Sequence, residues 1–270
     1  MNRIDETLTR LNESKKKMLS PYITAGDPEP DFTVSLMHAL VEGGADALEI
    51  GVPFSDPMAE GPVIQGAMER ALAHGVCMDD VLNMVAEFRT KNTETPIILM
   101  GYLNPIEQYG YETFIKRVKQ VGVDGTILVD LPPEESETVA PLWEQYGVHA
   151  IYLCSPTTSD ERMSQVNRLG SGYLYYVSLK GVTGSNALDL ESVKHDYSRR
   201  KAQSRLPLMV GFGIKTPEIA ARIAQFADGV IVGAALIDTI HHAYKNQRDP
   251  LEAGKSFIAE MRQAMDNHPC

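Results

Sequence analysis

The feature that most constrains the fold of this chain is a repeated alternation of short apolar runs with longer amphipathic segments. Eight runs rich in branched residues occur along the sequence, and segments of helical period separate them. Strands that alternate with helices form parallel βαβ units, and eight such units close into a barrel more often than they form an open sheet. The expected strands are residues 18–24, 46–52, 96–102, 124–130, 148–154, 173–179, 206–212 and 228–234.

The length of the chain fits one such barrel. It has 270 residues, and about 250 residues is usual for a (βα)8 TIM barrel. No linker or low-complexity segment interrupts the alternation, so we predict a single TIM-barrel catalytic domain over residues 1–270. Ile4, Leu8 and Leu11 recur at helical spacing and predict an extra N-terminal helix. Thr216, followed by proline, is predicted to cap a later helix.

Composition and charge exclude several classes of protein. Hydrophobic residues at 43% and charged residues at 23% are typical of soluble globular chains. A net charge of −11 argues against nucleic-acid binding, and we expect the two basic runs, 15–17 and 199–201, to be solvated helix ends. No window approaches the roughly 18 apolar residues of a membrane span. Residues 1–18 are too polar for a signal peptide, so we expect a cytoplasmic protein.

The metal-binding and redox residue types support neither a metal site nor a disulfide framework. The three cysteines, Cys77, Cys154 and Cys270, are odd in number and lack CxxC spacing. The seven histidines form no HExxH motif. We therefore expect no metal and a reducing environment.

The stretch ALEIGVPFSDPMAEGP, residues 47–62, contains two acids that flank one loop. Glu49 alternates with Leu48 and Ile50, which are expected to pack on helices, so Glu49 should point into the barrel near the carboxyl ends of its strands. Desolvation should raise the pKa of Glu49 and suit it to acid–base chemistry, with Glu60 as a second carboxylate in the loop. The alternative is a structural glutamate paired with a buried base, although the other expected strands contain no Lys or Arg.

Glycine-bearing turns follow the last three expected strands, at residues 180–186, 211–217 and 231–237. Loops at this end of a barrel, backed by a helix N-terminus, frequently bind phosphate. The turns predict a phosphorylated substrate, although each alone is compatible with ordinary turn chemistry. The first turn opens a long polar segment that is either a lid with Thr183 at its tip or an ordinary loop.

Aromatic and apolar residues near strand ends predict a pocket for a flat hydrophobic ligand. Each of them, taken alone, is more typical of the barrel core. They are Tyr22, Met100, Tyr102, Ile127, Tyr175 and Phe212.

Six motifs occur in the order and at the spacing of one known family: PYITAGDP, LEIGVPFSDP, GPVIQ, MGYLNPI, GVTG and GFGI. The chain resembles the tryptophan synthase alpha chain family over about residues 18–240. The resemblance implies a lyase that cleaves indole-3-glycerol phosphate to indole and glyceraldehyde 3-phosphate by a retro-aldol reaction. It implies no cofactor in this chain, and a pyridoxal-phosphate beta chain as the partner in an alpha-beta-beta-alpha complex.

The resemblance also assigns roles to residues. It gives acid–base catalysis to Glu49, and to Glu60 the part played by an aspartate in the best-known members. Ala234 stands where some members have serine. The implied substrate-binding residues are Tyr22, Met100, Tyr102, Ile127, Tyr175, Thr183 and Phe212; the implied phosphate-binding residues are Gly184, Gly213, Gly233 and Ala234; and the implied partner contacts are Pro53, Asp56, Asn104 and Pro105.

Two other functions stay open at this point. One is a free-standing indole-releasing lyase, which would turn over fully without a beta chain. The other is a catalytically weakened alpha chain, kept to bind and activate its partner.

Overall fold

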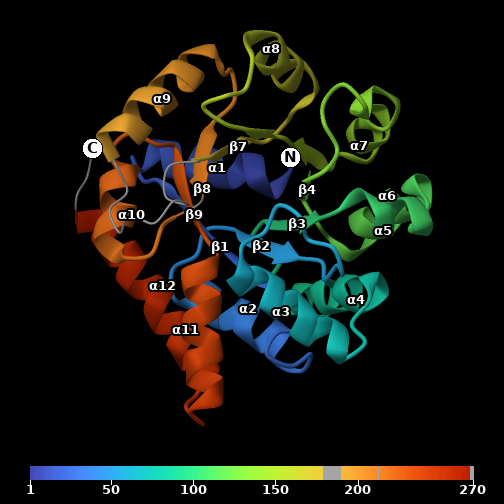
Figure 1. Ribbon diagram of the computed structural model, residues 1–270, viewed down its shortest axis with the longest axis vertical. Helices are drawn as coiled ribbons and strands as arrows, with labels where there is room; N and C mark the ends of the chain where they lie inside the picture. Colours follow the sequence, from blue (N-terminus) through green and yellow to red (C-terminus); the bar gives the residue numbers. More distant parts are fainter. Residues whose placement is uncertain (179–189, 212, 268–270) are drawn as a thin grey trace.

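The computed structural model describes residues 1–178, 190–211 and 213–267 (Figure 1). Its strands form one parallel sheet in the order β5-β4-β3-β2-β1-β9-β8-β7-β6, with helices around the outside. The predicted (βα)8 barrel is confirmed. The strands are β1 (Met18–Thr24), β2 (Leu48–Gly51), β3 (Ile97–Gly101), β4 (Gly125–Leu128), β5 (His149–Ile151), β6 (Leu153–Cys154), β7 (Leu174–Val177), β8 (Leu208–Gly211) and β9 (Gly229–Val232).

The helices follow the strands in sequence, as βαβ units require. They are α1 (Arg3–Glu13), α2 (Phe32–Glu42), α3 (Pro62–Ala73), α4 (Met78–Arg89), α5 (Leu103–Tyr109), α6 (Tyr111–Val121), the 3-10 helix η1 (Ser136–Thr138), α7 (Ala140–Tyr146), α8 (Asp160–Leu169), α9 (Leu190–Gln203), α10 (Pro217–Ala224), α11 (Ala234–Lys245) and α12 (Pro250–Asn267). The Thr216 hydroxyl accepts the Ile219 N–H, so the predicted cap of α10 is confirmed.

The fifth expected strand is divided into β5 and β6. The division falls at Tyr152, between β5, which pairs with β4, and β6, which pairs with β7. The Tyr152 carbonyl still accepts the Tyr175 N–H at 2.9 Å. The two short strands together therefore fill one position of the barrel, and the ring closes through them.

The alternation of side chains along β2 is as predicted. Leu48 and Ile50 are buried in the large cluster that joins the sheet to the surrounding helices. Ala47 belongs to a separate cluster inside the barrel. Because successive side chains of a strand point to opposite faces, Glu49 lies inside the barrel with Ala47.

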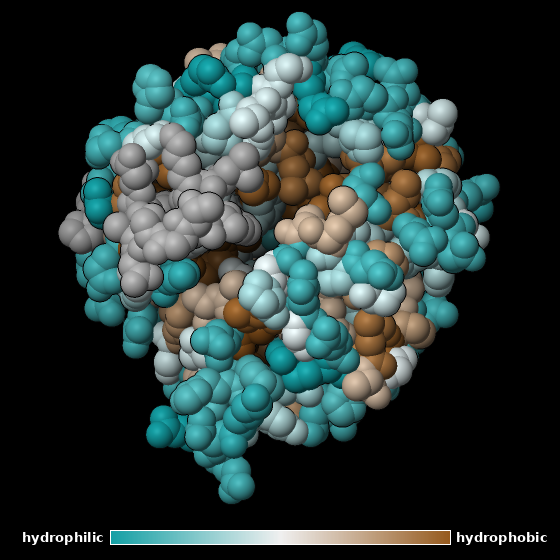
Figure 2. All heavy atoms as spheres, viewed as in Figure 1, coloured by the Kyte–Doolittle hydropathy of each residue, from teal (hydrophilic) through white to brown (hydrophobic). Residues whose placement is uncertain are grey.

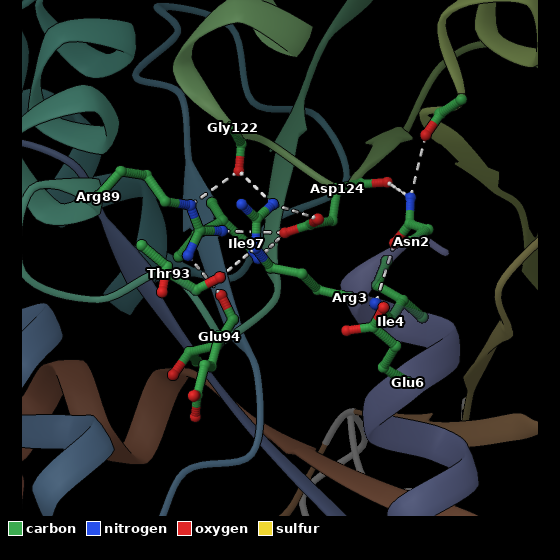
Figure 3. Close-up of polar contacts among 12 residues, drawn as sticks. Asn2, Arg3, Ile4, Glu6, Arg89, Thr93, Glu94, Ile97, Gly122 and Asp124 are labelled. Carbon is green, nitrogen blue, oxygen red and sulfur yellow. Dashed lines mark hydrogen bonds and ion pairs between the residues drawn. The ribbon is translucent and has the colours of Figure 1, made fainter.

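The predicted N-terminal helix is α1, and it closes the amino end of the barrel. Ile4 and Leu11 are buried in the interior cluster. Two neighbouring side chains fasten α1 to the loops at the amino end of the barrel. The Asn2 side chain donates to the carbonyls of Asp124 and Gly147, and Arg3 pairs with the Asp124 carboxylate at 2.9 Å (Figure 3). The barrel thus has a sealed amino end.

Asp124 is the centre of this amino-end network. It is 3% exposed. One carboxylate oxygen accepts from Arg3, and the other accepts from Arg89 and from the Ile97 N–H, each at 2.9 Å (Figure 3). Asp46 and Asp228 lie just before β2 and β9. Their carboxylates likewise accept a backbone N–H from a neighbouring strand, that of Leu19 for Asp46 and that of Leu208 for Asp228.

One expectation about the basic runs is wrong. Arg200 is 2% exposed, and its guanidinium donates to the Asp160 carboxylate and to the Pro156 carbonyl. The arginine therefore joins α9 to α8 and to the loop before it, instead of lying in solvent. The spacing of the run could not reveal this, because Arg199 and Lys201 on either side keep more exposure.

Among the described residues, no helix is long and apolar enough to cross a membrane. The same residues contain no group of three or more His, Cys, Asp or Glu arranged to hold a metal ion. Cys77 and Cys154 are both free thiols.

Candidate active site

Glu49 lies at the centre of the site, on β2. It is 0% exposed, and its Oε1 accepts a hydrogen bond of 2.8 Å from the Tyr173 hydroxyl. Its Oε2 has no hydrogen-bond partner among the described residues. Burial raises the pKa of Glu49 to about 8; the Tyr173 bond opposes that rise, and the nearby charge of Glu60 adds to it. Glu49 is therefore a buried acid with one oxygen held and one oxygen free.

Tyr173 is the partner that the sequence reasoning missed. The expected alternative for Glu49 was a buried base, but no Lys or Arg among the described residues forms an ion pair with it. A tyrosine hydroxyl leaves the carboxyl group able to carry a proton, whereas a paired cation would hold it ionised. Tyr173 comes from the turn before β7 and packs in the interior cluster. Its place at the start of an expected strand was the only available signal.

Glu60 lies in the loop between β2 and α3 and is partly buried. Its N–H donates to the Pro57 carbonyl at 3.0 Å, and its own carbonyl accepts from the Gln65 side chain at 2.8 Å. Burial raises the pKa of Glu60 to about 7. Burial therefore raises the pKa of both acids toward neutral pH, as acid–base chemistry requires.

Two tyrosines reach into the site because glycines leave room for them. A Cβ atom on Gly51 would lie 2.0 Å from the Tyr22 hydroxyl oxygen, and one on Gly211 would lie 2.1 Å from the Tyr175 hydroxyl oxygen. Tyr22 is also the register neighbour of Glu49 across the β1–β2 pair. Burial raises the pKa of both tyrosines well above the usual value, so both hydroxyls stay protonated.

The apolar wall of the site connects the interior cluster with α3 and α11. Tyr22, Ala67 and Ile237 pack together, and Met100 contacts both this group and the interior cluster, in which Ile127 is fully buried. Figure 2, in the same view as Figure 1, shows apolar surface in a hollow near the middle of this face, within a hydrophilic rim. This surface is suited to a flat apolar group.

Tyr102 joins two loops at the carboxyl end of the barrel. Its hydroxyl accepts the Ala59 N–H at 3.1 Å, and its ring stacks on Phe54 with centroids 5.1 Å apart. The residue therefore supports the backbone next to Glu60, a role that its expected place in the pocket did not suggest.

The residues expected to bind phosphate are placed only in part. Gly213 has a positive φ of 76°. Gly233 is the N-cap of α11, lies beside Tyr22, and is followed by exposed Ala234. The N–H groups at the N-terminus of a helix suit an anion, and here that helix end lies beside Tyr22. Thr183, Gly184 and Phe212 lie outside the described residues.

The residues expected to contact a partner differ in exposure. Asp56, in the loop after β2, and Asn104, in the first turn of α5, are exposed, and Pro105, also on α5, is partly buried. Pro53 is buried. Any contribution of Pro53 to docking would therefore come from the backbone that it shapes.

The fold and the site together define a class. Two carboxyl groups with raised pKa values, an apolar pocket and a free helix N-terminus gather at the carboxyl end of a parallel barrel. That end carries the active site in characterised enzymes of this fold. The protein is a TIM-barrel enzyme.

Comparison with known proteins gives the family. The family model described as tryptophan synthase alpha chain matches residues 8–266, and the chain belongs to that family. It is 67% identical over 267 residues to the tryptophan synthase alpha chain of Legionella pneumophila, covering 99% of this chain and 98% of that one. It is 52% identical over 266 residues to the alpha chain of Cupriavidus taiwanensis, covering 98% and 100%.

Solved structures agree with this assignment. A crystal structure of tryptophan synthase subunit alpha from Legionella pneumophila superposes with a TM-score of 0.95 at 65% identity, covering 99% of both chains. A structure of tryptophan synthase from M. tuberculosis gives a TM-score of 0.86 at 30% identity, covering 98% of this chain and 99% of that one. The barrel geometry is therefore kept at both levels of identity.

Proposed function

We propose that this chain cleaves indole-3-glycerol phosphate by a retro-aldol reaction and releases indole and glyceraldehyde 3-phosphate. The observation that carries the proposal is Glu49, a fully buried carboxyl group with one oxygen on Tyr173 and the other without a partner among the described residues. The family supports the same reaction.

The pKa of Glu49, raised to about 8, keeps most of this group protonated at neutral pH. Glu49 first donates its proton to C3 of the indole ring, which leaves positive charge on the ring N–H. The Glu49 carboxylate then removes the proton from the glycerol hydroxyl next to C3. The C–C bond breaks, the hydroxyl carbon becomes the aldehyde, and the bonding electrons restore the aromatic indole. Glu49 ends as it began, having given one proton and taken one.

Glu60 has a different task in this proposal. The lower pKa of Glu60, about 7, leaves a substantial carboxylate fraction at neutral pH. A carboxylate beside the ring N–H stabilises the positive charge that C3 protonation creates. The two acids thus divide the work, and the reaction requires no cofactor in this chain.

The remaining site residues bind the substrate in this proposal. The indole ring lies between Tyr22, Met100 and Tyr175, and the phosphate lies on the N-terminal N–H groups of α11 around Gly233 and Ala234. Gly213 supports the phosphate from the neighbouring loop. The substrate-binding roles that the sequence predicts also stay part of this proposal for Thr183, Gly184, Phe212, Tyr102 and Ile127.

The partner in this proposal is a tryptophan synthase beta chain that carries pyridoxal phosphate, in an alpha-beta-beta-alpha complex in the cytoplasm. Asp56, in the loop after β2, and Asn104, on α5, are exposed at the carboxyl end of the barrel, so a protein docked there would receive indole directly. Pro53 shapes the loop after β2, and Pro105 lies next to Asn104 on α5.

The test is to supply the purified chain with indole-3-glycerol phosphate, with and without beta chain, and to measure indole and glyceraldehyde 3-phosphate. We expect slow release by the chain alone and faster release with the beta chain. Full turnover without beta chain would instead indicate a free-standing lyase. No release in either mixture, together with activation of the beta chain, would indicate a catalytically weakened alpha chain.

A further inference from the structure

The backbone around Glu60 is fixed from three directions. The Glu60 N–H donates to the Pro57 carbonyl within the loop. The preceding N–H, of Ala59, donates to the Tyr102 hydroxyl. The Glu60 carbonyl accepts from the Gln65 Nε2 at 2.8 Å. Of these three contacts, only the last comes from α3, the helix that forms one wall of the site.

The Gln65 bond does not serve the helix on which Gln65 lies. The groups that lack partners at a helix N-terminus are N–H donors, and a capping side chain must accept from them. Gln65 instead donates, and to a carbonyl outside the helix, because α3 begins at Pro62 with Gly61 as its N-cap. The bond therefore stabilises the peptide group of Glu60 and satisfies none of the free N–H groups of α3.

The helix that carries Gln65 is itself held against the site. Ala67, on the next part of α3, is fully buried against Tyr22 and Ile237, and Val63 and Ile64 pack on the same group. At its far end, Arg70 pairs with Asp27, through Nε to Oδ1 at 2.6 Å and through Nη2 to Oδ2 at 3.1 Å. A rigid helix with one donor directed at the Glu60 carbonyl can fix the backbone from which that acid extends.

We propose that Gln65 is a positioning residue for Glu60, which sets the place of the Glu60 carboxylate by holding its backbone carbonyl. This inference rests on the proposed function, in which Glu60 faces the indole N–H. A glutamate side chain has several rotatable bonds, so its carboxylate needs a fixed backbone to return to one place. Loss of the Gln65 donor leaves substrate binding intact and displaces the carboxylate from the transition state.

The experiment is a double-mutant cycle with Gln65→Met and Glu60→Ala, assayed for indole release with beta chain present. A misplacement of about 1 Å can cost on the order of a hundredfold in rate. Because two other contacts remain, we expect Gln65→Met to lower kcat about threefold, less than loss of the Glu60 carboxylate itself, with KM changed less than about twofold. In the Glu60→Ala background, which has no carboxylate to position, Gln65→Met should have no further effect.

Two additional variants keep the cycle interpretable. Gln65→Glu keeps the shape, removes the donor and should lose activity as Gln65→Met does, even if Gln65→Met folds poorly. Gln145→Met changes an exposed glutamine on α7 and should match the parental chain.

Equal fold-losses from Gln65→Met in both backgrounds, or no loss in the parental background, would overturn the positioning role. Parental activity in Glu60→Ala would overturn the assigned role of Glu60, and with it this inference. Failure of the parental chain to release indole would instead contradict the proposed function itself.

Discussion

The two ends of the barrel use buried carboxyl groups in opposite ways. At the amino end, Asp46, Asp124 and Asp228 each accept an N–H from the start of a neighbouring strand and pair with a basic side chain. At the carboxyl end, neither Glu49 nor Glu60 has a basic partner within the part of the chain that the structure describes. The buried residues at both ends are carboxylic acids, and the two ends differ in whether a basic side chain lies beside them.

The difference shows what decides the role of a buried acid. A cation and a backbone N–H favour the charged form, and at Asp46 they oppose the rise in pKa that burial causes; the acid then connects segments of the chain. Without a cation, burial raises the pKa, to about 8 for Glu49 and about 7 for Glu60, and the acid can exchange a proton near neutral pH. The barrel thus keeps cation-paired acids at one end, and at the other end two acids without a basic partner among the described residues, to which we assign proton transfer as a proposal.

The largest expected effect comes from removing an acid at the amino end. Asp124→Ala leaves Arg89 and the Ile97 N–H without their partner. Breaking a buried ion pair in this way costs about 3–5 kcal/mol. We expect urea unfolding to show a loss of that size, while the folded fraction keeps its rate of indole release.

A surface pair provides the control for this prediction. Glu134→Ala breaks an exposed pair with Arg162, and such pairs contribute at most about 1 kcal/mol. If Asp124→Ala were no more costly than Glu134→Ala, the amino-end network would not be the stabilising element described above.

The complementary change at the carboxyl end should affect the rate and spare the fold. Glu49→Gln keeps the shape of the side chain and its contact with Tyr173, but it cannot carry the proton. We expect turnover to fall by about a hundredfold or more with little change in substrate affinity. Glu69→Gln, at an exposed position on α3, is the matched control and should be silent. Substantial turnover by a well-folded Glu49→Gln chain would rule out Glu49 as the principal acid–base group.

The same variant should change how stability depends on pH. Because the folded chain raises the pKa of Glu49 from 4.5 to about 8, the stability that this group contributes is fully present below pH 4.5 and is lost as the pH rises toward 8. Glutamine does not titrate. Relative to the parental chain, Glu49→Gln should therefore gain on the order of 2 kcal/mol in unfolding free energy between pH 6 and pH 9. Parallel stability–pH curves for the two chains would show that the pKa is not raised.

Glu60 should have the smallest of these effects, because it lies in a loop and only assists. We expect Glu60→Gln to lower indole release about tenfold. Glu60→Asp should bring no improvement, since the loop is built around the longer side chain and a shift of about 1 Å matters. Parental rates in Glu60→Ala, with beta chain present, would mean that Glu49 works alone.

Much of the fold could be predicted from the sequence, because it depends on local patterns. The alternation of apolar runs with amphipathic segments predicted the position of every strand. The alternation of side chains along β2 predicted that Glu49 points into the barrel. The break at Tyr152 could not be seen, because the run 148–154 is apolar throughout and the geometry of ring closure decides where it divides. That the whole chain forms one domain stays a prediction.

The site was less predictable, because its key contacts join distant segments. The partner of Glu49 is Tyr173, 124 residues away in the sequence, and the support of the Glu60 loop includes Tyr102, 43 residues from Ala59. No spacing rule connects such pairs. The buried Arg200 shows the same limit, since its setting depends on packing between α8 and α9. The catalytic and binding roles of the named residues remain predictions that the variants above can test.

The closure of the amino end by α1 has a consequence for the order of folding. Asn2 bonds to the Gly147 carbonyl, 145 residues later, and Lys16 pairs with Asp266, 250 residues later. Contacts across such separations form slowly, because a long loop must close before they stabilise the chain. During synthesis the first helix therefore emerges long before the strands that receive it. The helix α1 is therefore made before its partners and is among the last segments to reach its native position, and until then its apolar face stays available to chaperones.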